Sequence, residues 1–265
     1  MQESLVKYLA GIMDADGCLS FMFSDRKEHD DAFYVVLHMF LASSDTVDKH
    51  GFLETLPALT GMGAVYRETK NAQCRRWTVT KGADIEMLLP RLIKHMVVKG
   101  KHWQWMLETR RRYRGVTLTR AQCVDLVAAS RKSRVENAGP VKPKSHPTWA
   151  WVAGYLDGDG HYSFKSRNKK NGCLNIYVGA TAHVNDVIAL DLLQKAFGGR
   201  IMDHVGAAQV KRWRRNLGPR DGSFALRFLP KVVNHSRLKK HAIEQILHIH
   251  SQRLSVSAPT GGATV

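Results

Sequence analysis

The chain has 265 residues, enough for one large domain or two small ones. Its composition, 44% hydrophobic and 24% charged, is that of a folded protein, but 40 Lys and Arg against 23 Asp and Glu give a formal net charge of +17. Such an excess favours an anionic partner, nucleic acid before an anionic membrane, because self-repulsion otherwise destabilises a compact state.

Several classes of protein are disfavoured by the sequence. Its apolar runs are shorter than the roughly 20 residues of a membrane span, and the first residues lack the basic and apolar regions of a signal peptide. The four cysteines are far apart without a CxxC pair, which argues against a zinc ribbon or a disulfide framework. We therefore expect an intracellular protein, not secreted and without a membrane partner, in a bacterial or archaeal cytoplasm or an organelle.

The expected elements of the first half alternate between helical and strand periodicity. In chain order they are an apolar helix ending near Asp16, strands at 18–26 and 33–42, a helix from Ser44 or Asp45 to Gly61, strands at 64–69 and 75–80, a short helix from Asp84 and a basic helix over 99–113. This order is typical of a mixed unit of helices and antiparallel strands.

The second half is expected to repeat this order after a joining segment that contains a helix at 120–132 and a linker rich in Pro and Gly. Its elements are an apolar helix ending near Asp159, strands at 161–169 and 174–182, a helix from about Asn185 to Phe197, strands near 200–205 and 223–229, and helices to about 253. The expected division is a first domain at 1–115, a linker at 116–147, a second domain at 148–254 and a flexible tail at 255–265.

The two halves carry the same motif. Residues 8–17 read YLAGIMDADG and residues 151–160 read WVAGYLDGDG. Later positions also correspond, each 140 residues apart: Pro90 and Pro230, His95 and His235, Lys99 and Lys239. Matches in the same order through both halves indicate that the protein contains two copies of one unit.

Each motif has two small residues four positions apart, Gly11 and Ala15 in the first and Gly154 and Gly158 in the second. Residues at this spacing share one helix face. Small side chains there let two helices approach more closely than the usual distance of about 8–10 Å between axes. We therefore expect the two motif helices to pack on each other about a pseudo-twofold axis.

This packing brings Asp16 and Asp159 to one place, at the carbonyl ends of both helices. Two carboxylates there form a negative spot that neither helix dipole relieves, so we expect it to bind divalent cations. Paired metal ions suit phosphodiester hydrolysis. The alternative, that both aspartates only hold turns before glycine, accounts less well for a duplicated motif in so basic a chain. For Asp14 and Asp157 we expect structural anchoring.

The two decapeptides resemble the motif of the LAGLIDADG homing endonucleases, and the double copy resembles their single-chain members. The resemblance covers nearly the whole chain except the linker and tail. It implies an α+β fold of two pseudo-symmetric αββαββα domains, packed through the paired motif helices, whose antiparallel sheets form a DNA-binding saddle. It also implies that Asp16 and Asp159 bind catalytic Mg²⁺ with the backbone carbonyls of Ala15 and Gly158. Mn²⁺ would be a substitute, and Ca²⁺ an ion that binds without supporting cleavage.

The resemblance assigns two further kinds of catalytic position. One is a lysine in each half that contacts water or the scissile phosphate, and the candidates are Lys99 and Lys239, or their neighbours Lys101 and Lys240. The other is a polar residue after the second strand, which is Asp45 in the first half but falls near Ala182 or His183 in the second. We therefore expect two chemically unequal half-sites.

Candidate DNA-binding residues follow from strand alternation, which places polar and basic side chains on one face of 161–169. They are His161, Ser163, Lys165, Arg167 and Lys169 in that strand, Ser20, Ser24, Arg26, Arg75 and Arg76 in the first half, and Lys211, Arg212, Arg214 and Arg215 in an extra basic stretch of the second. A two-stranded ribbon of this kind fits the DNA major groove, and the alternative is a solvated sheet face.

The function implied by the resemblance is that of a site-specific, metal-dependent endonuclease, monomeric without a required protein partner. We expect it to be intron-encoded or free-standing in preference to part of an intein. It would make a staggered double-strand cut in a long, asymmetric target in double-stranded DNA. Two alternatives remain open: a maturase that binds intron RNA, and a DNA-binding regulator without catalysis. The presence of both Asp16 and Asp159 argues against the regulator.

Overall fold

The structure, a computed structural model, describes residues 1–25, 32–44, 47–67, 74–142, 146–168, 173–204, 206–217 and 222–256. Three candidate site residues, Arg26, Asp45 and Lys169, lie outside these ranges. Within them, the helices are too short or too polar for any to cross a membrane.

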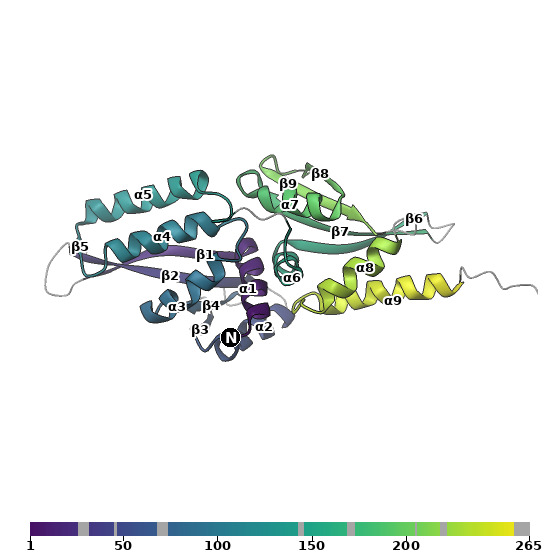
Figure 1. Ribbon diagram of the computed structural model, residues 1–265, viewed down its shortest axis with the longest axis horizontal. Helices are drawn as coiled ribbons and strands as arrows, with labels where there is room; N and C mark the ends of the chain where they lie inside the picture. Colours follow the sequence, from purple (N-terminus) through teal and green to yellow (C-terminus); the bar gives the residue numbers. More distant parts are fainter. Residues whose placement is uncertain are drawn as a thin grey trace, which may run out of the picture.

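The first half runs helix, hairpin, helix, hairpin, helix, helix (Figure 1). Its elements are α1 (Glu3–Ala15), β1 (Gly17–Asp25), β2 (Phe33–Ser44), α2 (Val47–Thr60), β3 (Ala64–Arg67), β4 (Cys74–Val79), α3 (Gly82–Ile93) and α4 (Gly100–Arg112). The strands form an antiparallel sheet in the order β1-β2-β4-β3. The short strand β5 (Thr117–Leu118), which precedes the joining helix, pairs with β2 and extends this sheet.

The second half repeats the arrangement. Its elements are α6 (Trp149–Gly158), β6 (Gly160–Asn168), β7 (Cys173–His183), the 3₁₀ turn η1 (Val184–Asp186), α7 (Ile188–Phe197), β8 (Arg200–Asp203), β9 (Val210–Asn216), α8 (Gly222–Val233) and α9 (Lys240–Val256). The sheet order β6-β7-β9-β8 matches that of the first half. The expected α+β fold with two related antiparallel sheets is confirmed.

One face of each sheet is packed under helices, because alternate strand residues are apolar. In the first sheet Leu19 and Phe21 of β1 and Met39 of β2 are buried, as are Val178 of β7 and Trp213 of β9 in the second. We call this side of each sheet the helix-covered face. The residues between them in sequence point to the opposite face, where Met22 is half exposed.

One expected strand was wrong. Residues 223–229 lie within α8, and the strand that completes the second sheet is β9, formed by the basic stretch around Trp213. The buried residues Ala225, Phe228 and Leu229 follow the spacing of a helix rather than a strand. In β9 the only fully buried side chain is Trp213. Because the residues on both sides of it are charged, the sequence does not show the alternation of apolar and polar residues that is typical of a strand.

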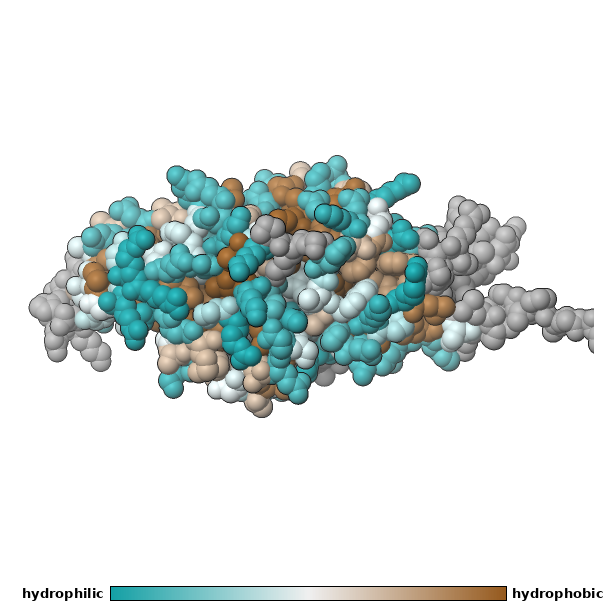
Figure 2. Space-filling view, viewed as in Figure 1, coloured by the Kyte–Doolittle hydropathy of each residue, from teal (hydrophilic) through white to brown (hydrophobic). Residues whose placement is uncertain are grey.

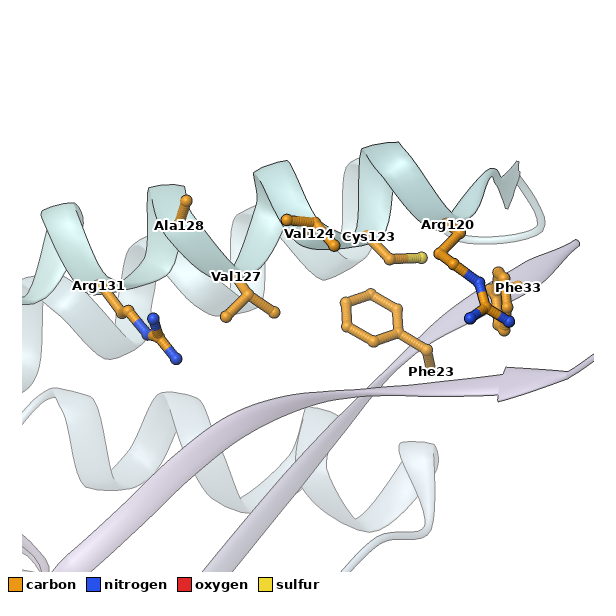
Figure 3. A pocket seen from close by; sticks show the side chains of 8 residues that line it. All are labelled: Phe23, Phe33, Arg120, Cys123, Val124, Val127, Ala128 and Arg131. Carbon is orange, nitrogen blue, oxygen red and sulfur yellow. The ribbon is translucent and has the colours of Figure 1, made fainter. Parts of the chain in front are cut away.

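The two halves are joined by the long helix α5 (Arg120–Glu136), which begins with a capping box formed by Thr119 and Gln122. It extends four residues beyond the expected 120–132 and packs beside α4 (Figure 1). Between α5 and the β1–β2 hairpin lies an apolar groove of about 430 Å³, bordered by Phe23, Phe33 and Val124 (Figure 3). The face drawn in Figure 2 carries hydrophilic residues with hydrophobic ones scattered between them.

Candidate active site

The two motif helices, α1 and α6, lie against each other at the centre of the molecule (Figure 1). An added Cβ on Gly11 would lie 2.1 Å from the carbonyl oxygen of Trp151, and one on Gly154 would lie 2.0 Å from that of Tyr8. Both distances are far below any non-bonded contact. The close approach therefore requires glycine at both positions.

Each motif helix also donates a hydrogen bond to the buried aspartate of the other. The Tyr8 hydroxyl donates to Asp157 at 2.8 Å, and the Trp151 indole Nε1 donates to Asp14 at 2.9 Å. Tyr8 and Trp151 occupy the same place in the two copies of the motif. Two different side chains thus make equivalent bonds across the pseudo-twofold axis, and these bonds tie the halves together.

The same aspartates anchor the loop before the next helix in their own half. Asp14 accepts hydrogen bonds from the backbone amides of Val97 at 2.6 Å and Lys99 at 2.9 Å, just before α4. Asp157 accepts from the Ser236 hydroxyl at 2.7 Å and from the amides that precede α9. Burial raises the pKa of Asp14, and these donors oppose that shift. The structure thus shows the anchoring role expected for both aspartates.

The anchored loops carry Lys99 and Lys239 to the ends of the motif helices. The Lys99 ammonium donates to the carbonyls of Met13, Ala15 and Gly17 at 2.8–3.0 Å. Three donors thus meet three carbonyl oxygens at the negative end of the α1 dipole. Burial lowers the pKa of Lys99, and the Asp14 carboxylate opposes this change.

Lys239 repeats the arrangement, donating to the carbonyls of Leu156 at 2.6 Å, Gly158 at 3.3 Å and Gly160. The expectation that these lysines point at water or at the scissile phosphate therefore needs correction, because each ammonium bonds the end of its motif helix. The two alternative lysines do not lie at the ends of the motif helices. The side chains of Lys101 and Lys240 are exposed, and Lys240 pairs with Glu244 at 3.9 Å.

Asp16 and Asp159 follow these helices as their C-cap residues. Asp16 is exposed, whereas Asp159 is half-buried. Burial and the charge of Asp16 raise the pKa of Asp159 to about 7, and Lys99 and Lys239 oppose the increase. The two carboxylates are therefore close enough to repel each other, as expected from the packing of the helices.

This arrangement suits a divalent cation. The donors are hard oxygens: two carboxylates and the carbonyls of Ala15 and Gly158, each of which keeps one lone pair after bonding its lysine. In the described part of the chain no group of three His, Cys, Asp or Glu side chains forms a metal site. A cation here would thus take further ligands from water or substrate, as Mg²⁺ commonly does.

Asp186, in the turn η1, is a residue that sequence reasoning missed. Its carboxylate raises the pKa of Asp159, so it lies near the acidic pair, and it pairs with Arg134 of α5 at 3.5 Å. The sequence pointed to Ala182 or His183 for a polar residue after the second strand, but β7 and the turn continue three residues further. The place expected for Asp45 in the first half lies outside the described residues.

The candidate DNA-binding residues of the second sheet divide between its two faces. Arg212 and Arg214 point to the face opposite the helices, where the Arg214 guanidinium lies 3.6 Å from the centre of the Tyr177 ring. Lys211 and Arg215 lie on the same side of β9 as Trp213, which is the helix-covered face. The assignment of both residues to DNA binding therefore needs correction. Lys211 pairs with Asp203, and Arg215 lies 4.8 Å from the Phe224 ring of α8.

Residues of β6 occupy the same opposite face. His161 and Ser163 alternate with Tyr162. The side chains of Lys165 and Arg167, two further candidates in this strand, lie outside the part of the structure that is described.

In the first sheet Ser20, Ser24 and Arg76 take the face opposite the helices, and the Arg76 guanidinium lies 4.2 Å from the centre of the Phe40 ring. Arg75 needs correction, because it points to the helix-covered face and pairs with Glu54 of α2. Alternation separates Arg75 from Arg76 although the two are adjacent in sequence. Of the two arginines, only Arg76 is placed for a partner on the outer face.

Comparison with known proteins identifies the fold. No protein-family model matches the sequence, and no curated protein matches it. Among solved structures, I-SmaMI bound to an uncleaved DNA target with calcium ions has a TM-score of 0.73 at 14% identity, over 95% of this chain and 92% of that chain. The LAGLIDADG homing endonuclease I-GzeII, in complex with its DNA target, has a TM-score of 0.71 at 13% identity, over 97% and 93%.

A third similar structure is the LAGLIDADG homing endonuclease I-LtrWI bound to target DNA, with a TM-score of 0.71 at 16% identity over 96% of this chain and 91% of that chain. All three align with nearly the whole chain, including both halves. The chain therefore has the fold of the single-chain LAGLIDADG homing endonucleases, and the resemblance carried by the two motifs is confirmed at the level of the fold.

Proposed function

We propose that this protein is a site-specific DNA endonuclease that hydrolyses phosphodiesters with divalent cations, Mg²⁺ first among them. The observation that carries the proposal is the pair Asp16 and Asp159, which two glycine-packed helices bring together although their charges repel. Two carboxylates held so close together destabilise the folded protein unless cations bind there. The fold shared with I-SmaMI and I-GzeII, both of which bind DNA targets, supports the same proposal.

The residues of the chain have distinct tasks in this function. Asp16, Asp159 and the carbonyls of Ala15 and Gly158 would hold the cations, which supply Lewis acidity at the phosphate and an activated water. Lys99 and Lys239 hold the ends of both helices and place positive charge behind the carboxylates. Their role in catalysis is thus to position the acidic pair.

The target follows from the difference between the two sheets. The face opposite the helices carries Arg212, Arg214 and His161 in the second half, but Arg76 with Ser20 and Met22 in the first. Two unequal surfaces match an asymmetric double-stranded DNA site, which one copy of the chain would span as a monomer. Each half then supplies one acidic residue to the hydrolysis of the two strands. The product is a staggered double-strand cut.

The test begins with selection of cleaved sites from a random DNA library, followed by nicking assays on a supercoiled plasmid that carries the selected site. With Mg²⁺ the wild type is expected to linearise the plasmid, whereas Asp16→Asn and Asp159→Asn should each lower the rate by at least roughly a hundredfold. Asp125→Asn, an exposed change on α5, is the matched control and should cut at the wild-type rate. Equal cutting by all four proteins would overturn the metal assignment. Specific binding of intron RNA without DNA cleavage would indicate a maturase instead.

A further inference from the structure

The residue two positions after each motif aspartate differs between the halves. It is Cys18 in the first and His161 in the second, and each is the second residue of the first strand of its sheet. The strand register places Phe40 opposite Cys18 and Gly179 opposite His161. At this pair of positions each half therefore has one ring, Phe40 on the second strand of the first sheet and His161 on the first strand of the second.

The His161 ring is seated by the glycine across from it. An added Cβ on Gly179 would lie 2.5 Å from Cε1 and 2.6 Å from Nε2 of the imidazole, so only glycine leaves room for the ring. On its other side the ring meets the edge of Tyr177, with 6.3 Å between ring centroids and an angle of 82° between planes. In the second half the ring thus comes from the other strand of the pair, and it is polar instead of apolar.

Among the described residues, no group hydrogen-bonds the buried Nε2 of His161. A buried polar atom without a partner is costly, and pairing with a ligand removes that cost. Turning the ring toward a ligand would also break no hydrogen bond at this nitrogen. The charges that act most strongly on this ring, on Arg212, Lys239 and Arg214, are positive, which makes an anion the ligand that fits.

We propose that His161 binds a phosphate of the DNA backbone beside Asp159 by donating a hydrogen bond from its imidazole, and that this contact makes the second half-site cut its strand faster than the first. The inference rests on the proposed endonuclease function. In the first half Phe40 fills the equivalent place and has no donor. The Arg76 guanidinium lies over that ring and His38 lies beside it, with 5.3 Å between ring centroids, so the first half binds the backbone in a different way.

The experiment follows both strands of the selected site separately, with a different label on each, in a single-turnover reaction with Mg²⁺. In the wild type, the strand held by the second half should be cut first. His161→Phe, which copies the ring of the first half, should slow that strand by roughly 10- to 100-fold, the range of one hydrogen bond to a charged oxygen. The other strand should change by less than about threefold. His161→Gln retains a donor at a similar reach and should recover most of the lost rate.

A reciprocal variant, Phe40→His, places a donor in the first half and should accelerate the other strand, whereas Phe40→Leu, its control, should not. Affinity for the same DNA in EDTA provides a readout without catalysis, and His161→Phe should weaken it while His161→Gln should not. Equal effects of His161→Phe on both strands, or on neither, would overturn the inference alone. A wild-type protein that cuts neither strand would overturn the proposed function, and the inference with it.

Discussion

At the residue scale, a buried ammonium group closes the end of each motif helix. Lys99 and Lys239 donate to carbonyls on either side of the acidic pair, and Asp14 and Asp157 hold the loops that carry them. This combination explains how two helix C-termini and two carboxylates can share one place. The positive charges of the lysines oppose the rise in the pKa of Asp159.

Stability should therefore depend on the buried lysine and not on its neighbour. Lys99→Met removes three buried hydrogen bonds to the carbonyls at the end of α1, so we expect the free energy of unfolding to fall by about 3 kcal/mol. Lys101→Met, at an exposed position of α4, should leave it unchanged. Urea denaturation of both variants without DNA or metal measures the difference. A lysine that acted only on the substrate would lower cleavage and leave the urea midpoint in place.

At the scale of elements, the pair α1 and α6 determines how the halves meet. Backbone lies against backbone at Gly11 and Gly154, and side chains of each helix bond the aspartate of the other. The same helices end at Asp16 and Asp159, so the interface also determines the distance between the two acidic groups. Packing and chemistry thus depend on the same residues.

A single methyl group at this interface should be strongly destabilising. Gly11→Ala would place its Cβ 2.1 Å from the Trp151 oxygen, and because backbone cannot yield as a side chain does, we expect a loss of about 3 kcal/mol or more. Gly51→Ala, in α2, meets no atom within 4 Å and should raise stability by roughly 0.5–1 kcal/mol through helix propensity. Thermal and urea denaturation distinguish the two. Equal stability of both variants would contradict the close helix contact.

At the scale of the whole molecule, the net charge of +17 is divided between different tasks. Arg76, Arg212 and Arg214 point to the face opposite the helices, while Arg75 and Arg215 are packed against helices on the covered face. Only the first group is available for a polyanion that lies across both sheets. The total charge therefore overstates the number of cations that DNA would meet.

Salt dependence of DNA binding should separate the two groups. Each phosphate that a cation neutralises contributes about −0.9 to the slope of log affinity against log salt. Arg212→Ala and Arg214→Ala should each make the slope shallower by about that amount, whereas Arg215→Ala should leave it unchanged. Fluorescence anisotropy between about 50 and 200 mM salt measures the slope. A change at Arg215 equal to that at Arg214 would contradict the assignment of faces.

The sequence by itself determined the features that depend on local spacing and repetition. Small residues four positions apart predicted the contact of α1 with α6, and the duplicated motif predicted that Asp16 and Asp159 meet. The joining helix and most strands were also predicted, because their periodicities are strong. These features depend on neighbours along the chain, and for that reason one sequence was enough.

Only the tertiary structure decided the features that depend on distant partners. It placed Arg75, Lys211 and Arg215 on the helix-covered face, because the face of a strand residue depends on which side the helices pack. It turned Lys99 toward carbonyls and brought Asp186 to the acidic pair through a turn whose length the sequence does not reveal. Direction and proximity across the chain are properties of packing, and here packing gives each charged group its task.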